Sequence, residues 1–359
     1  MNNTLEHWFG LNSNEEIKIE KEVINKHANT KTIFYFDSTT MKSYWLSKKP
    51  KNISFSFIVN WDKIPILLCT NLNQNDSYEI PKETYYNNEH LSFIKSNLQK
   101  CIRRQLSSKA IKTGYHMIKL NLNEFLRRIS IIIIEDIILH ESYSTIIWLM
   151  VATSSKKNVL KITKNIVDWL LGLIKTLCDI NEYDILEPTD KKYHMDELNN
   201  YDLLYSLQFR KSYGGMNGDM KMLNYATNSW LNKFNNNVNC DTTKINLIDS
   251  NEINTLDLKE LELDNCNIAG LDFHCFPFMI KMINKKHNNY TEKEIRSAIW
   301  NCSSKINYRK VNNNDDNNDN DNNDDNDDND AHIQIWNNIK DEVFNTQKYI
   351  LTKHIQPNF

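Results

Sequence analysis

Glycine, proline and closely spaced cysteines are scarce in this chain of 359 residues, which contains 7 glycines, 6 prolines and 7 cysteines. The cysteines are scattered singly and none forms a C-x-x-C pair, which argues against a disulfide framework and a standard zinc module. We therefore expect the protein to reside in a reducing compartment. Asparagine and lysine are abundant instead, a composition typical of an AT-rich genome such as that of a large DNA virus.

The sequence also lacks a segment suited to a membrane. Its most apolar run, residues 129–152, is interrupted by Glu135, Asp136, His140 and Glu141, and charges at the centre of a bilayer are costly. The first residues have neither the basic region nor the apolar core of a secretory signal. We expect a soluble intracellular protein, not a secreted one, without a membrane partner.

The overall charge is close to neutral, with 43 Lys and Arg residues against 46 Asp and Glu residues. Nine of the acidic residues lie in one Asn/Asp tract at 311–331, which leaves 37 elsewhere. Such a tract cannot bury apolar surface, so we expect it to be disordered. The rest of the chain is mildly basic, which suits a polyanionic partner.

Hydrophobic periodicity predicts an α+β, mostly α-helical fold. After an exposed leader at 1–30, residues 31–90 predict a small antiparallel β-sheet, because apolar and polar residues alternate around Phe55 and Phe57. A helical body follows. Its parts are a basic helical domain at 91–180, a second helical region at 181–310 and, after the tract, a C-terminal helix at 332–359.

Several helix limits are also readable. An apolar stripe predicts a first helix from about Ile94 to Leu106, a second covers 109–119, and a third begins near Asn123 as its N-cap. The four consecutive isoleucines that follow fit a buried helix better than a strand, because the apolar residues on either side of them recur with a helical period. Later, Thr-Glu-Lys-Glu at 291–294 is a capping box that predicts a helix start.

Two short patterns occur in order between residues 96 and 137. The first is S-x-L-x-K-x-x-R at 96–103, and the second is F-L-R-R followed by E-D-I at 125–137. Together they resemble the C-terminal helical region of the replication-associated recombination ATPases, the family that includes a Werner-helicase-interacting member in eukaryotes. The resemblance covers about sixty residues and implies a helical module associated with DNA maintenance.

The ATPase that precedes this region in the family is absent, since no GxxxxGK[ST] occurs anywhere in the sequence. The resemblance therefore implies no ATP-driven activity. For the second pattern we predict a structural ion-pair role, because an acid on an apolar helix face needs a partner. The residues concerned are Arg127, Arg128, Glu135 and Asp136.

Basic residues concentrate on the predicted helices from 95 to 128, where a single acid, Glu124, occurs. We predict salt-sensitive, sequence-independent contact with nucleic acid there, and the alternative is a solvated helix face. The candidate contacts are Lys95, Lys100, Arg103, Arg104, Lys109 and Lys112. A second segment, 298–309 (AIWNCSSKINYR), mixes aromatic and basic residues as single-strand binders do, although its Trp300 has helical spacing that also suits a core position.

The leader resembles the sliding-clamp-binding box, with Asn2 in place of its usual glutamine. In that box one helical turn inserts an aliphatic and two aromatic side chains into an apolar pocket, here Leu5, Trp8 and Phe9. A sliding clamp or another replication protein is thus a candidate partner. The alternative is an N-terminal helix that packs these aromatic residues on its own domain.

No catalytic constellation, metal site or cofactor motif is predicted. Three cysteines and two histidines between 266 and 302 fit no standard zinc spacing, and the acids at 62, 76, 79 and 83 lack the further pattern of a nuclease. We expect a non-enzymatic accessory protein of DNA replication or repair that binds nucleic acid. The alternative is a structural or assembly adaptor with an acidic protein partner.

Overall fold

The computed structural model describes residues 31–82, 86–155, 160–198, 201–254, 266–312 and 326–355. The chain forms two compact units, each assembled from three segments. Unit 1 comprises 1–79, 126–169 and 185–244, and unit 2 comprises 80–125, 170–184 and 245–359. The residues expected to form one basic domain, 91–180, are thus divided between the two units. The expected α+β, mostly helical fold is confirmed.

Unit 1 begins with a four-stranded sheet in the order β2-β1-β4-β3. Its strands are β1 (Ile33–Asp37), β2 (Lys42–Leu46), β3 (Phe55–Trp61) and β4 (Ile64–Thr70). Two antiparallel hairpins, β1–β2 and β3–β4, are joined by parallel pairing of β1 with β4. The expectation of a purely antiparallel sheet is therefore wrong, because hairpin patterns do not reveal how two hairpins pair with each other.

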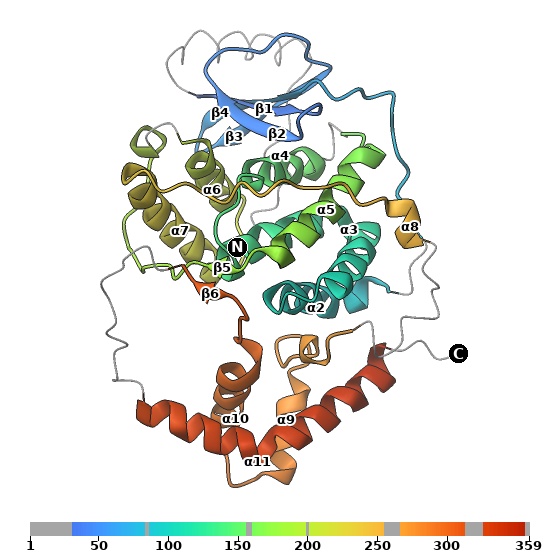
Figure 1. Ribbon diagram of the computed structural model, residues 1–359, viewed down its shortest axis with the longest axis vertical. Coiled ribbons are helices and arrows are strands. Elements are labelled where there is room, and N and C mark those ends of the chain that lie inside the picture. The colour runs from blue at the N-terminus through green and yellow to red at the C-terminus, as the bar shows by residue number, and fades with distance from the viewer. Residues whose placement is uncertain are drawn as a thin grey trace. The chain divides into compact units, whose positions relative to one another are not determined.

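One face of the sheet packs on α4 (Tyr143–Ser154) and α6 (Asp202–Ser212), which lie beneath it in Figure 1. Aromatic rings fill the space between these layers: Phe34 stacks on Trp45 with centroids 4.3 Å apart, and Phe209 meets Trp45 edge-on at 5.3 Å. The indole N–H of Trp45 donates to Ser206 Oγ at 3.0 Å, so this buried polar group is satisfied.

A turn with positive φ at Gly214 and Gly215 connects α6 to α7 (Asn217–Asn235). The two helices pack together as an antiparallel pair. A short 3-10 helix, η3 (Met195–Leu198), precedes α6.

Unit 2 contains α2 (Leu91–Arg103), preceded by η2 (Asn88–His90), and the apolar stripe predicted for α2 is buried. Helices α3 (Ser107–Asp136) and α5 (Lys164–Asp179) extend across the unit boundaries. Strand β5 (Glu182–Tyr183) pairs in parallel with β6 (Lys310–Val311).

Helix α3 contains a kink at Asn121, whose φ of −163° and ψ of 93° are not helical. The Asn121 side chain accepts a hydrogen bond from the Glu124 backbone N–H at 3.1 Å, as an N-cap does. The cap is therefore Asn121 and not Asn123, two residues from the predicted position. The isoleucines at 131–134 are helical and buried, as predicted.

The remaining elements of unit 2 are short except α11. They are α8 (Ser250–Asn254), η6 (Ile268–Gly270), α9 (Phe278–Lys286), α10 (Glu292–Ile299), the π-helix η7 (Trp300–Ser304), α11 (Asn326–Ile350) and a π-helical end, η9 (Leu351–Ile355). Helices α9, α10 and α11 pack on one another. The predicted capping box at Thr291 is present, and α11 begins inside the tract expected to be disordered.

No helix in the described part of the chain has the length and apolar character needed to cross a bilayer.

Candidate nucleic-acid interface

A buried ion pair lies at the centre of unit 2. Helix α2 places Ser96 and Lys100 one turn apart, and Lys100 Nζ lies 2.9 Å from Asp272 Oδ2 and 3.1 Å from Ser96 Oγ. Asp272 belongs to the loop after η6. Both charged side chains are almost fully buried, at 7% and 1% exposure, so each needs the other to offset its loss of hydration.

The Asp272 carboxylate accepts further hydrogen bonds. Its Oδ2 also accepts from Ser304 Oγ at 2.8 Å, and Oδ1 accepts from the Phe273 backbone N–H at 2.6 Å. Burial alone would raise the pKa of Asp272, but the hydrogen bond from His274 and the charge of Lys100 outweigh it and hold the pKa far below its usual range. Asp272 is therefore ionised.

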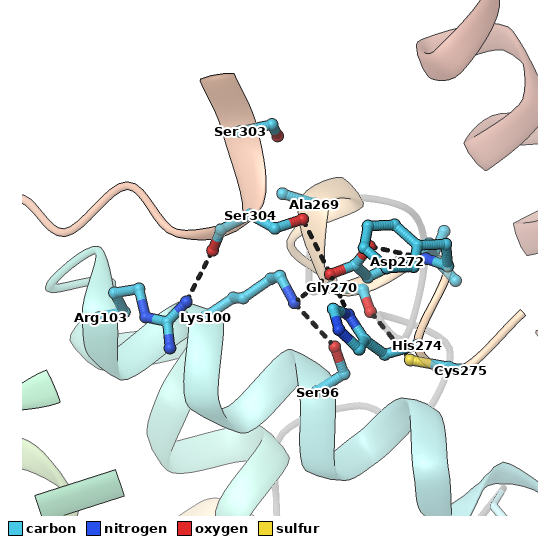
Figure 2. Close-up of polar contacts among 12 residues, drawn as sticks. Ser96, Lys100, Arg103, Ala269, Gly270, Asp272, His274, Cys275, Ser303 and Ser304 are labelled. Atoms are coloured by element: carbon cyan, nitrogen blue, oxygen red, sulfur yellow. Dashed lines mark hydrogen bonds and ion pairs between the residues drawn. The ribbon is translucent and has the colours of Figure 1, made fainter. Parts of the chain in front are cut away.

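The same carboxylate orients His274, whose Nδ1 lies 3.0 Å from Asp272 Oδ2 (Figure 2). An ionised carboxylate cannot donate, so Nδ1 carries the proton. The imidazole stacks on Phe273 with centroids 4.2 Å apart and contacts Trp300 edge-on at 5.7 Å. The His274 side chain is 55% exposed, and its contact with Asp272 fixes the orientation of the ring.

Two arginines at the end of α2 hold the backbone of η7. Arg103 Nη1 donates to the Ser304 carbonyl at 2.6 Å, and Arg104 Nη2 donates to the Ser303 carbonyl at 2.8 Å. These carbonyls belong to the last turn of η7, and the Ser303 carbonyl also accepts from the backbone N–H of Ile306 at 3.4 Å. Burial lowers the pKa of Arg104 from its ordinary value.

A third arginine, Arg309, fixes the segment after η7. It is buried and donates to the carbonyls of Leu177 at 2.6 Å, Ile180 at 2.8 Å and Arg103 at 3.1 Å. Residues 300–310 are thus tied at both ends to the helices beneath them.

This segment exposes aromatic and basic side chains, and we call these exposed residues the 300–310 surface. Trp300 is 38% exposed and Tyr308 61% exposed, and Lys305 and Lys310 are also exposed. No acidic residue occurs from 300 to 310. The sequence had marked this segment as aromatic and basic, and the structure places its Trp300 partly at the surface.

The six basic residues predicted to contact nucleic acid have different environments. Lys100 and Arg103 are buried in ion pairing and carbonyl binding, so they do not present charge at a surface as a basic helix face would. Arg104 is half-buried against η7, and Lys95 pairs with Glu124. The side chains of Lys109 and Lys112 are half-buried.

The predicted ion-pair residues belong to unit 1. Arg127 Nη2 donates to the Gly214 carbonyl at 3.2 Å, and Asp136 is buried. Burial raises the pKa of Asp219, and the charges of Arg128 and Arg127 partly counteract it. The predicted ion-pair role of Arg127, Arg128, Glu135 and Asp136 stays a prediction.

One further predicted site is not described. The candidate clamp-binding residues Asn2, Leu5, Trp8 and Phe9 lie outside the described residues, so their role stays a prediction. Among the residues that the structure describes, no three His, Cys, Asp or Glu side chains are grouped closely enough to hold a metal ion.

No protein-family model, curated protein or solved structure matches this chain. The resemblance to the recombination ATPases likewise stays a prediction.

Sequence reasoning missed the contribution of Asp272, and it considered His274 among the cysteines and histidines at 266–302 that fit no standard zinc spacing. The local signal is Asp-Phe-His at 272–274, which places a carboxylate two residues before an imidazole. That spacing indicates a site only once the contacts of Asp272 with Lys100 and Ser304 are known.

Proposed function

We propose that this protein binds single-stranded nucleic acid through the 300–310 surface, as a non-enzymatic accessory protein of DNA replication or repair. The observation that carries the proposal is the exposure of Trp300 and Tyr308 on a backbone that is fixed from beneath. Large aromatic side chains gain most from burial, and exposed ones that are held in place are available to stack on another ring.

The charge of the surface favours a polyanion. Lys305 and Lys310 are exposed, and the segment 273–291 also lacks acidic residues while α9 exposes Lys281 and Lys285. A third exposed lysine of α9, Lys286, pairs with Glu342 at 2.9 Å. Aromatic platforms combined with basic side chains are the usual means of binding a single strand without sequence preference, because every base has a face that can stack.

The buried arginines add rigidity to this arrangement. Arg103 and Arg104 fix the carbonyls at the end of η7, and Arg309 fixes the turn after Tyr308. A backbone held by such supports loses less conformational freedom on binding, which favours affinity. A π-helix is also rare and is often found at functional sites.

Fluorescence anisotropy of labelled single-stranded and duplex oligonucleotides over a salt series tests the proposal. We expect the single strand to bind more tightly, with an affinity that falls steeply with salt because phosphate contacts release counterions. Replacing Lys305 and Lys310 together by alanine should weaken binding and flatten the salt slope. The matched control replaces the exposed Lys340 and Lys353 on α11 and η9, and should change neither.

Heparin provides the second arm of the experiment. Preference for the single strand over heparin at equal charge supports stacking of bases. Equal binding of both would instead favour the adaptor for an acidic protein, and absence of binding at low salt would contradict both.

A further inference from the structure

Two histidines of this chain illustrate different uses of an imidazole. In unit 1, the buried His140 uses both nitrogens: Nδ1 contacts Ser142 Oγ at 2.7 Å, and Nε2 contacts the Thr243 carbonyl at 3.0 Å. In unit 2, His274 contacts Asp272 through Nδ1 while its side chain is 55% exposed. His140 therefore has a purely structural role, whereas His274 is accessible to a ligand.

The contact with Asp272 engages Nδ1 of His274, which leaves Nε2 as the ring nitrogen available to a ligand. Because Nδ1–H donates to the ionised carboxylate, the proton of the neutral ring is on Nδ1 and the acceptor is Nε2. The ring itself contacts Trp300 edge-on, with centroids 5.7 Å apart.

The charged groups around the imidazole come from three elements. Asp272 lies beneath it, and Lys100 from α2 shares the same carboxylate oxygen. Arg296 from α10 lies over the ring of Phe273, 5.5 Å from its centroid, and Phe273 in turn stacks on His274. Asp272, the carboxylate in contact with His274, already accepts from Lys100, Ser304 and the Phe273 backbone N–H. Its negative charge is therefore offset, which favours an anionic ligand at His274.

We propose that His274 anchors a backbone phosphate of the bound strand through Nε2, next to a base stacked on Trp300. This inference rests on the proposed function and assigns the phosphodiester as the group that His274 recognises. A neutral imidazole with its proton on Nδ1 presents only an acceptor at Nε2, whereas the imidazolium presents a donor. The hydrogen bond to phosphate therefore requires uptake of a proton, and binding of the strand is tighter at acid pH.

The test measures anisotropy of a labelled single-stranded oligonucleotide at pH 5.5 and pH 8.0 at constant salt. The wild-type protein should bind about tenfold more tightly at the lower pH, since a charge-assisted hydrogen bond is gained. The variant His274→Gln keeps a polar side chain that does not ionise, and it should lose most of that ratio. Its matched control, His287→Gln, changes a half-buried histidine after α9 and should keep the ratio.

The outcomes separate the two proposals. Equal pH ratios in the wild type and His274→Gln, with binding that still depends on Lys305 and Lys310, overturn the role of His274 and leave the proposed function intact. Absence of strand binding at both pH values overturns the proposed function together with this inference. Circular dichroism of each variant confirms that the exposed substitution has left the fold unchanged.

Discussion

Lys100 and Asp272 form a buried ion pair, with 2.9 Å between Nζ and Oδ2, and they connect α2 to the loop that carries His274. Neither side chain can return to water without opening unit 2. The pair is the structural base of the proposed interface, because Asp272 also binds His274 and Ser304.

Replacing Lys100 by methionine should destabilise unit 2 strongly. The change leaves the Asp272 carboxylate buried without its cation, which costs about 3–5 kcal/mol in the free energy of unfolding. Urea denaturation followed by circular dichroism measures this. The control is Lys175→Met on α5, whose pair with Asp179 has both side chains 52% exposed and should contribute less than about 1 kcal/mol. Equal losses would show that the buried pair has no special role.

Gly172 on α5 should not tolerate a side chain. A Cβ atom there would lie 1.9 Å from the Asn246 carbonyl oxygen, a backbone atom that cannot rotate away. Gly172→Ala should therefore cost about 3 kcal/mol or more, the upper part of the range for overpacking. The control, Gly218→Ala on α7, meets no atom within 4 Å and should stabilise the helix by up to about 1 kcal/mol. Thermal denaturation compares the two, and a stable Gly172→Ala protein would contradict the close approach.

His116 should make the protein less stable in acid. Burial and the charge of Lys119 lower the pKa of His116 to about 4, whereas an unfolded histidine titrates near about 6.5. The unfolded chain binds the additional proton between these values, so the contribution is complete above about pH 6.5 and is lost as the pH falls towards 4. The total is about 3 kcal/mol. Urea unfolding at several pH values should show a smaller pH slope for His116→Gln, and an unchanged slope would contradict the account.

Local patterns predicted the elements of this fold well. The alternation around Phe57 predicted β3, and Thr291 with Glu294 predicted the start of α10, because these signals involve neighbouring residues and the periodicity of one element. The cap of the kinked α3 was placed two residues late, since Asn121 and Asn123 are chemically equal in a sequence.

Contacts between distant segments could not be predicted. In the sequence, Lys100 and Arg103 are two cations of a basic helix. No neighbouring residue indicates that Lys100 pairs with the buried Asp272 or that Arg103 binds the Ser304 carbonyl. The parallel pairing of β1 with β4 is likewise a relation between two hairpins, each complete in its local pattern. The aromatic and basic segment 298–309 was visible, but the exposure of Tyr308 was not.

The most direct test of the proposed interface removes its two aromatic platforms. The double variant Trp300→Ala/Tyr308→Ala should bind a labelled single strand at least about tenfold more weakly, because stacking contributes about 1–3 kcal/mol for each base. The control, Phe344→Ala/Tyr349→Ala, removes two aromatic residues of α11 that are 43% and 46% exposed, and should bind as the wild type does. Equal affinity of the wild type and Trp300→Ala/Tyr308→Ala would contradict the account.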